Sequence, residues 1–231
     1  MTYVLHYAPD NASLIIRLAL EHRGLEYRCE LVDRASAAQS KPAYRALNPN
    51  GLIPVLETPK GPIFETGAIL LWLADTHAGL GPAPDDPARG DFLKVLFFVS
   101  NTIHPALRML FYPEKYIAAE QANALRLGLQ THLKTAFATL NDIAEAKPDW
   151  LGGAHPTILD FYTAAVLRWP VLYPSDQDRT WFALSDYPAL HRICTRLETL
   201  PCVHALQSAE GLGETPFTAP KHPNPPEGSA T

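Results

Sequence analysis

The chain has 231 residues, 47% of them apolar, and a formal net charge of −5 at neutral pH. This length suits one large domain or two modest ones, and folding buries about 70% of the unfolded chain's surface without covalent staples. The sequence has no apolar run of the ~20 residues that a membrane span needs. It has no signal-peptide pattern and no basic cluster. We therefore expect neither a membrane nor a nucleic acid as partner.

The reactive residue types show no motif for metal or nucleotide chemistry. Three cysteines, Cys29, Cys194 and Cys202, are odd in number and form no CxxC pair, which predicts free thiols and a cytoplasmic location. The nine histidines lack HxxxH and HExxH spacing, so no metal site is expected. The sequence also lacks GxSxG, P-loop and GxGxxG motifs.

Hydrophobic periodicity predicts an α/β order in the first 78 residues. The predicted elements are strand 3–7, helix 13–23, strand 27–32, short helix 41–47, strands 55–57 and 63–64, and helix 66–77. The last of these helices is apolar on every side, and such a helix must be covered on both sides. Its sheet covers one side, so a second domain is expected on the other.

Composition then divides the rest of the chain. Residues 79–89, rich in Gly, Pro and Asp, are predicted to be a linker. Residues 90–214 show only helical patterns, with a kink expected at Pro105 and a helix end at Pro170. Residues 215–231 contain five prolines, which predicts a disordered or loosely draped tail.

Three local motifs carry most of the information about function. In Asn48-Pro49-Asn50-Gly51-Leu52-Ile53-Pro54-Val55-Leu56, an Asn-Gly turn leads into a strand through Pro54, where an X-Pro bond pays little to be cis. Glu65-Thr66-Gly67 opens the next helix. Thr157-Ile158-Leu159-Asp160 has the spacing of a capping box.

Together these motifs and the element order resemble the cytosolic glutathione S-transferase family, over about residues 1–212. The resemblance implies a thioredoxin-like domain (β-α-β-α-β-β-α) followed by an all-helical bundle. It further implies glutathione as co-substrate, without a metal. The assembly it implies is a homodimer in which the N-terminal domain of one chain meets the helical domain of the other.

The resemblance also places glutathione on particular residues. Glu65 offers a negative charge to the ammonium group of glutathione. Thr66 offers a hydroxyl and an N–H at a helix N-terminus, where an anion is favoured. Ile53, ahead of cis-Pro54, can pair its main chain with the cysteinyl backbone as an added strand does. Lys41 lies where the family often has a basic residue that binds the glycine carboxylate of glutathione.

The group that activates the thiol is left open by the sequence. A carboxylate at Asp10, where some family members have serine, is expected to repel a thiolate, and Ala12 excludes a mixed disulfide at the cysteine position of others. The remaining donors are Ser13, Asn11, Tyr7 and main-chain N–H groups of the same turn. Ser13 or Asn11 could equally cap the first helix, and Tyr7 could be a core residue.

An acceptor pocket is expected between the domains. Its apolar and aromatic surface is predicted to come from Met109, Tyr112, Tyr116 and Trp169, which suits an apolar electrophile, and His104 is a candidate proton carrier. The predicted activity is conjugation of the glutathione thiolate to such an electrophile. The alternatives are isomerase, peroxidase or disulfide reductase chemistry on the same site, or a family member that binds glutathione or a protein without catalysis.

Overall fold

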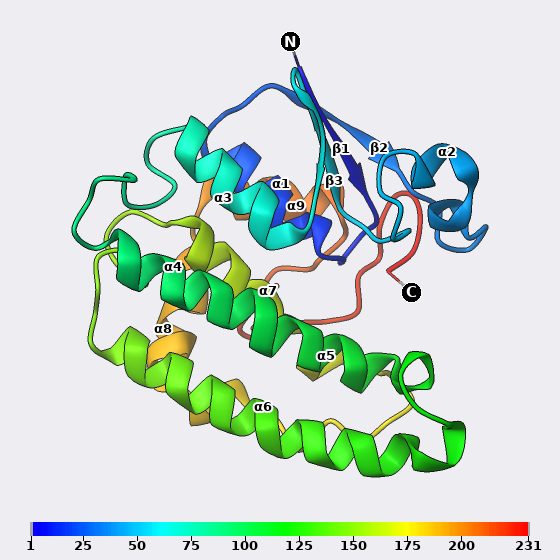
Figure 1. The fold of residues 1–231 in the computed structure, drawn as a ribbon. Helices are drawn as coiled ribbons and strands as arrows, with labels where there is room; N and C mark the ends of the chain where they lie inside the picture. The colour runs from blue at the N-terminus through cyan, green and yellow to red at the C-terminus, as the bar shows by residue number, and fades with distance from the viewer. Residues whose placement is uncertain (1, 231) are drawn as a thin grey trace.

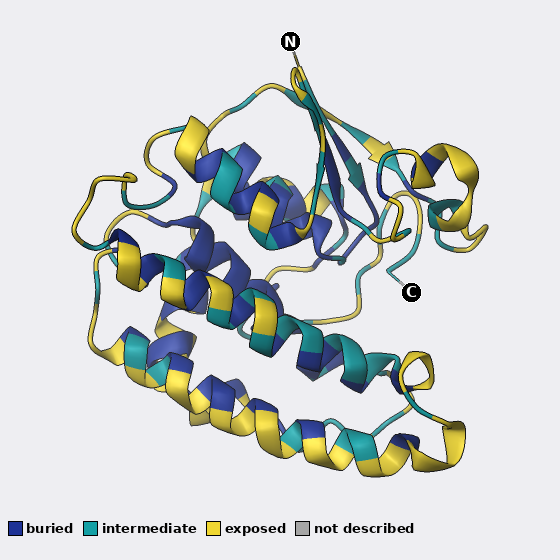
Figure 2. Ribbon diagram, in the orientation of Figure 1, coloured by how far each residue is buried: buried dark blue, intermediate teal, exposed yellow. Residues whose placement is uncertain are grey.

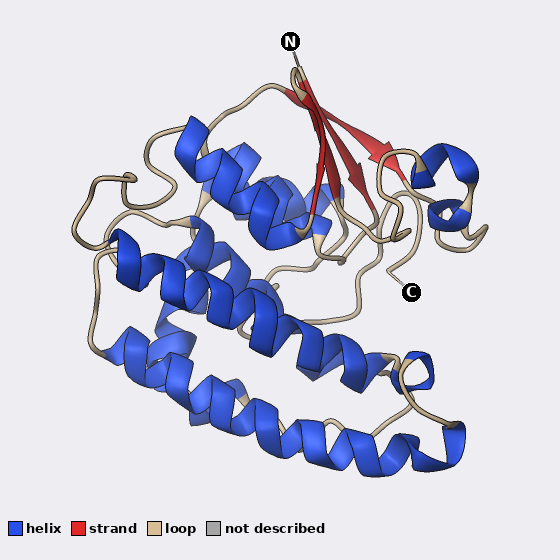
Figure 3. Cartoon of the chain, viewed as in Figure 1, coloured by secondary structure: helices blue, strands red, loops and turns tan. Residues whose placement is uncertain are grey.

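The chain folds into an N-terminal α/β domain and a C-terminal helical domain (Figure 1). The computed structural model describes residues 2–230. The first domain has the predicted order of strands and helices, and every regular element after it is helical (Figure 3). The predicted fold class is confirmed.

A four-stranded mixed sheet forms the centre of the first domain. Its strands are β1 (Tyr3–Tyr7), β2 (Tyr27–Leu31), β3 (Val55–Thr58) and β4 (Gly61–Phe64), in the order β2-β1-β3-β4. β1 runs parallel to β2 and antiparallel to β3, with Leu5 opposite Leu56. This order brings the loop after β1 beside the loop that enters β3.

Two helices, α1 (Ser13–His22) and α3 (Thr66–Thr76), cover one face of the sheet (Figure 1). α1 also packs against α7 and α9 of the second domain, and seven of its ten residues are buried. α3 packs on α1, β4 and α7. Its Leu71 and Trp72 remain half-exposed, so the second domain covers its outer side only in part.

The opposite face of the sheet carries the short helix α2 (Pro42–Arg45). Tyr44 packs there with Val32 and Val55 in a small separate cluster. The turn that follows is tight, because Gly51 has φ of +63° and a Cβ there would lie 2.9 Å from the Gln39 carbonyl oxygen. Glycine is therefore required at this position.

The second domain is a bundle around one central helix. Its helices are α4 (Arg89–Phe98), α5 (His104–Phe111), α6 (Ala122–Glu145), α7 (Ile158–Leu172), α8 (Pro188–Leu197) and α9 (Pro201–Ala209). α7 lies in the middle and is buried along nearly its whole length, whereas the outer side of α6 is exposed (Figure 2). At the start of α7, the Thr157 N–H donates to Asp160 Oδ2 (2.8 Å) and the Leu159 N–H donates to Thr157 Oγ1 (3.1 Å). These two hydrogen bonds form the expected capping box.

The two helix prolines behave differently from each other. Before Pro105 the helix winds into a π-helical segment, Val99–Ile103, which joins α4 to α5. The expected end at Pro170 is wrong, because α7 continues through Pro170 to Leu172. Pro170 stands in the last turn, where its missing N–H removes one helical hydrogen bond, and the helix ends two residues later.

Residues 215–230 of the tail pack against the folded domains, contrary to the expectation of disorder or loose draping. Phe217 is fully buried, and the N–H groups of Phe217 and Thr218 donate to Glu198 Oε1 at 2.7 and 2.8 Å. Farther on, the Asn224 N–H donates to the Gly211 carbonyl at 2.9 Å. Prolines prevent helix and strand here, but side chains and loops of the folded domains satisfy the main chain, so the segment lacks regular structure without lacking order.

Candidate functional site

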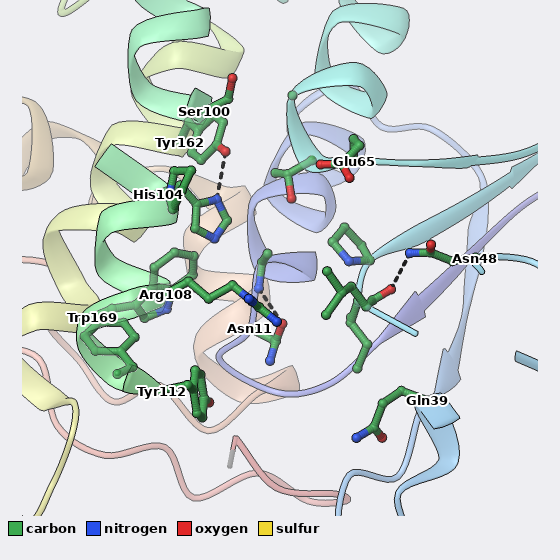
Figure 4. A pocket seen from close by; sticks show the side chains of 18 of the residues that line it. Asn11, Gln39, Asn48, Glu65, Ser100, His104, Arg108, Tyr112, Tyr162 and Trp169 are labelled. Carbon is green, nitrogen blue, oxygen red and sulfur yellow. Dashed lines mark hydrogen bonds between the residues drawn. The ribbon is translucent and has the colours of Figure 1, made fainter. Parts of the chain in front are cut away.

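A cavity of about 770 Å³ lies between the two domains (Figure 4). Its walls come from the loop after β1, the loop before β3, the N-terminus of α3, the helices α4 and α5, and α7. Of the residues proposed for the site from the sequence, the cavity is lined by Asn11, Ile53, Pro54, Glu65, Thr66, Tyr112, Tyr116 and Trp169, together with His104. The structure places Ser13, Tyr7, Lys41 and Met109 elsewhere.

The loop before β3 forms one wall. The Ile53–Pro54 peptide bond is cis, and among residues 2–230 no hydrogen bond occupies the Ile53 main chain. The buried Asn48 side chain fixes this loop: its Nδ2 donates to the Leu52 carbonyl at 2.8 Å, and its Oδ1 accepts the Asn50 N–H at 3.0 Å. Ile53 is thus presented with a free N–H and C=O, as an added strand requires.

The N-terminus of α3 forms the adjoining wall. The first helical bond there runs from the Ile69 N–H to the Glu65 carbonyl at 2.9 Å, so the N–H groups of residues 66–68 are unused by the helix. The Glu65 side chain is exposed to the cavity, and Thr66 is buried at its edge. An acid beside free helical donors suits a zwitterionic amino-acid head group.

Among the side chains proposed as thiol donors, that of Asn11 lines the cavity. Its Oδ1 accepts the Ala12 N–H at 2.9 Å. Since that contact needs the carbonyl oxygen, the amide's Nδ2 is left as a donor with no other hydrogen-bond partner in the described chain.

Ser13 and Tyr7 do not reach the cavity. The Ser13 hydroxyl is fully buried, donates to the Ala8 carbonyl at 3.0 Å and accepts the Ala8 N–H at 3.3 Å. The Tyr7 hydroxyl donates to Glu227 Oε1 of the tail at 2.5 Å. Burial raises the pKa of Tyr7, and the hydrogen bond to Glu227 raises it further. Both are structural residues, one closing the turn and the other holding the tail.

Asp10 is not a bare charge facing the thiol. Its carboxylate binds the Arg168 guanidinium at 2.8 and 3.0 Å, and it also accepts from Trp169 Nε1 (3.2 Å) and the Tyr173 hydroxyl (2.9 Å). The expected repulsion of a thiolate therefore does not hold, because Arg168 compensates the charge.

Two predicted site residues, Lys41 and Met109, do not line the cavity, and nearby residues in the chain line it in their place. Lys41 is exposed outside the cavity, while Gln39, two residues earlier, lines it with a buried Oε1 that has no partner in the described structure. Met109 packs against the helical core, and Arg108 takes its place in the wall. Neither Gln39 nor Arg108 belongs to a local motif, so no signal in the sequence identifies them.

His104 is held at the back of the cavity. Its Nδ1 lies 2.8 Å from the Tyr162 hydroxyl, and its ring packs on Trp169 at 5.3 Å between centroids (Figure 4). Burial, and secondarily the charge of Arg108, lowers the pKa of His104 to about 4. The ring is therefore neutral near pH 7.

The sequence also matches known families and structures. It matches the family models for the glutathione S-transferase N-terminal domain over residues 12–76 and C-terminal domain over residues 116–196. It is 28% identical over 214 residues to glutathione S-transferase GST-4.5 of Xanthomonas campestris, covering 90% of this chain and 98% of the relative. It is 29% identical over 219 residues to the disulfide-bond oxidoreductase YfcG of Escherichia coli, covering 91% and 96%.

The fold is also similar to that of solved structures. A sphingomonad glutathione S-transferase complexed with glutathione aligns with a TM-score of 0.72 at 28% identity, over 91% of this chain and 100% of that one. The family models and the relatives define a glutathione-dependent class of protein. The chain belongs to the glutathione S-transferase family.

No helix within residues 2–230 is long and apolar enough to cross a membrane. No group of three His, Cys, Asp or Glu side chains there is arranged to hold a metal ion. All three cysteines are free thiols, and none lines the cavity.

Proposed function

We propose that the protein conjugates the thiolate of glutathione to an electrophile held in the helical half of the cavity. The observation that carries this proposal is one continuous cavity. On one side it presents Ile53, cis-Pro54, Glu65 and Thr66, and on the other the aromatic side chains of α5 and α7. Binding both reactants in one cavity makes their reaction effectively unimolecular.

Glutathione binding is assigned to the α/β wall. Glu65 would hold the ammonium group, the N–H groups at the start of α3 the adjacent carboxylate, and the Ile53 main chain the cysteinyl unit. Calorimetry of glutathione with Glu65→Ala tests this assignment, with the exposed Glu26→Ala on the same domain as control. We expect Glu65→Ala to weaken binding about 10-fold or more, because a charged hydrogen bond contributes about 1.5–3 kcal/mol. Equal affinity of the two variants for glutathione would refute the assignment.

Asn11 is the proposed donor to the thiolate. A thiol has an ordinary pKa near 8.5, and one charge-assisted hydrogen bond can lower it by roughly 1–2 units. Thiolate ultraviolet absorbance of bound glutathione, followed against pH, measures this pKa. Asn11→Ala should raise it toward the solution value, whereas Tyr7→Phe, which alters a hydroxyl outside the cavity, should leave it unchanged. An ordinary pKa in the wild-type protein would favour binding without catalysis.

Disulfide reduction is the second candidate, favoured by the similarity to a disulfide-bond oxidoreductase. Because no cysteine lines the cavity, such a reaction would use the thiol of glutathione in place of an enzyme thiol. Parallel assays with a chloronitrobenzene and with a small disulfide, each with glutathione, rank the two activities.

A homodimer in the cytoplasm completes the proposal. The three free thiols suit a reducing compartment. Phe97 of α4 lies at the cavity rim with half its surface exposed, as expected of a residue near a contact between chains. Sedimentation equilibrium at micromolar concentration tests the dimer.

A further inference from the structure

The end of the cavity around Tyr112 and Tyr116 carries a cluster of positive charge. Arg34 comes from the loop after β2, Arg108 from α5, and Lys115 from the 3₁₀ turn Pro113–Lys115 that follows α5. All three line the cavity, and they gather around Tyr112 and Tyr116.

Their present partners are uncharged. Arg108 donates to the Tyr116 hydroxyl and lies over the same ring. Arg34 donates to the Ala230 carbonyl at 2.6 Å and to the Tyr112 hydroxyl at 3.1 Å. The Lys115 Nζ lies 4.6 Å from the centre of the Tyr112 ring. Within residues 2–230, no carboxylate forms an ion pair with any of these three cations.

Among residues 2–230 the cavity supplies no acid to neutralise them. Its acidic lining residues in the described chain are Asp10 and Glu65. Asp10 is already bound to Arg168, and Glu65 belongs to the opposite wall, as the residue that precedes α3 (Figure 4). The lowered pKa of His104, to which the charge of Arg108 contributes, agrees with a positive potential at this end of the cavity.

We propose that the second substrate is an anionic electrophile, an apolar planar body carrying a carboxylate. The carboxylate would bind Arg108 and Lys115, and the body would pack on Tyr112 and Trp169. This inference rests on the proposed function and narrows it, since a purely apolar acceptor would leave these charges without a role. Arg108 would act chiefly in specificity: guanidinium and carboxylate form strong, directional pairs.

A pair of model acceptors tests the proposal. A chlorobenzoate with a nitro group ortho to chlorine carries a negative charge, and its methyl ester is neutral and one methyl group larger. In either reaction the glutathione thiolate attacks the carbon that bears chlorine. The carbon–sulfur bond forms, the carbon–chlorine bond breaks, and chloride leaves with the bonding electron pair. Comparing the acid-to-ester ratio of kcat/KM between variants cancels the intrinsic reactivity of each compound.

Binding is measured separately, with unreactive nitrobenzoate and its methyl ester in the presence of glutathione. We expect the wild-type protein to prefer the acid by about 10-fold or more. Arg108→Gln should bring that preference close to unity, and Arg108→Lys should keep part of it. Lys115→Gln, at an exposed position, is a second variant with little risk to folding. Arg192→Gln, a surface arginine paired with Glu145, is the matched control.

Three results would overturn the proposal. The first is an acid-to-ester ratio that Arg108→Gln and Lys115→Gln leave unchanged. The second is an equal loss in Arg192→Gln, which would indicate net charge alone. The third is an equally large loss of glutathione affinity in Arg108→Gln, which would assign the cation to glutathione itself. If the acid is preferred in binding but no electrophile is turned over, the proposed conjugation fails while the anion site stands.

Discussion

The buried pair of Asp10 and Arg168 gives the sharpest test of how the molecule is held together. Both side chains are fully buried, and Arg168 belongs to the central helix α7. Asp10→Ala would leave the guanidinium with two carbonyl acceptors, those of Pro216 and Lys221, but no counter-charge. Removing one partner of a buried pair costs about 3–5 kcal/mol, a large share of the ~5–15 kcal/mol that stabilises a domain.

Urea denaturation followed by tryptophan fluorescence measures this loss, at one protein concentration so that any oligomer contributes equally. Asp10→Asn, which keeps the shape and an acceptor, should lose less than Asp10→Ala. The double variant Asp10→Ala/Arg168→Met should be less destabilised than the sum of the two single variants by about 2 kcal/mol or more, because it removes both charges. A loss below about 1 kcal/mol for Asp10→Ala, or strict additivity, would refute the reasoning.

Three further predictions concern stability. Burial raises the pKa of Glu210 from 4.5 to about 7. The free energy of unfolding should therefore be highest below pH ~4.5 and fall by about 3 kcal/mol as the pH rises through 7. Denaturation curves taken between about pH 4 and 8 measure this slope, which Glu210→Gln should flatten. Phe217→Ala should lower the free energy of unfolding by about 3–5 kcal/mol in a urea titration. If the tail were loosely draped, the same substitution would change that free energy very little. Thr157→Ala should lower the melting temperature through a loss of about 1–2 kcal/mol at the α7 capping box, and an unchanged value would contradict the role of the cap.

The parts of the fold and of the site that were predictable are those determined by contiguous residues. The turn before Ile53-Pro54, the Glu65-Thr66 helix start and the Thr157–Asp160 capping box each depend on neighbours within a few positions. Local sequence therefore determines their geometry. Fold class followed from the same local signals taken in order.

The thiol-facing turn was not predictable, because distant residues determine which way its side chains point. Asp10 adopts a φ of +49° and is held by Arg168, 158 positions away in the chain. That anchor leaves Asn11 facing the cavity while Ser13 closes back on Ala8. No pattern near Asp10 indicates either contact.

Of the predicted acceptor wall, Tyr112, Tyr116 and Trp169 line the cavity and Met109 does not. The π-helical segment Val99–Ile103 changes the helical phase of everything after it. Adjacent residues on a helix point about 100° apart, so a small change of phase exchanges Met109 for Arg108 at the cavity. The periodicity of the sequence carries no sign of that change.

Arg168 also constrains how this gene could be rearranged. A single side chain of the helical domain joins Asp10 of the α/β domain to two carbonyls of the tail. A chimera that took either domain from a relative without this pair would inherit one buried charge and no partner. Recombination at the interdomain linker should therefore succeed only when the aspartate, the arginine and the tail are exchanged or retained as one set.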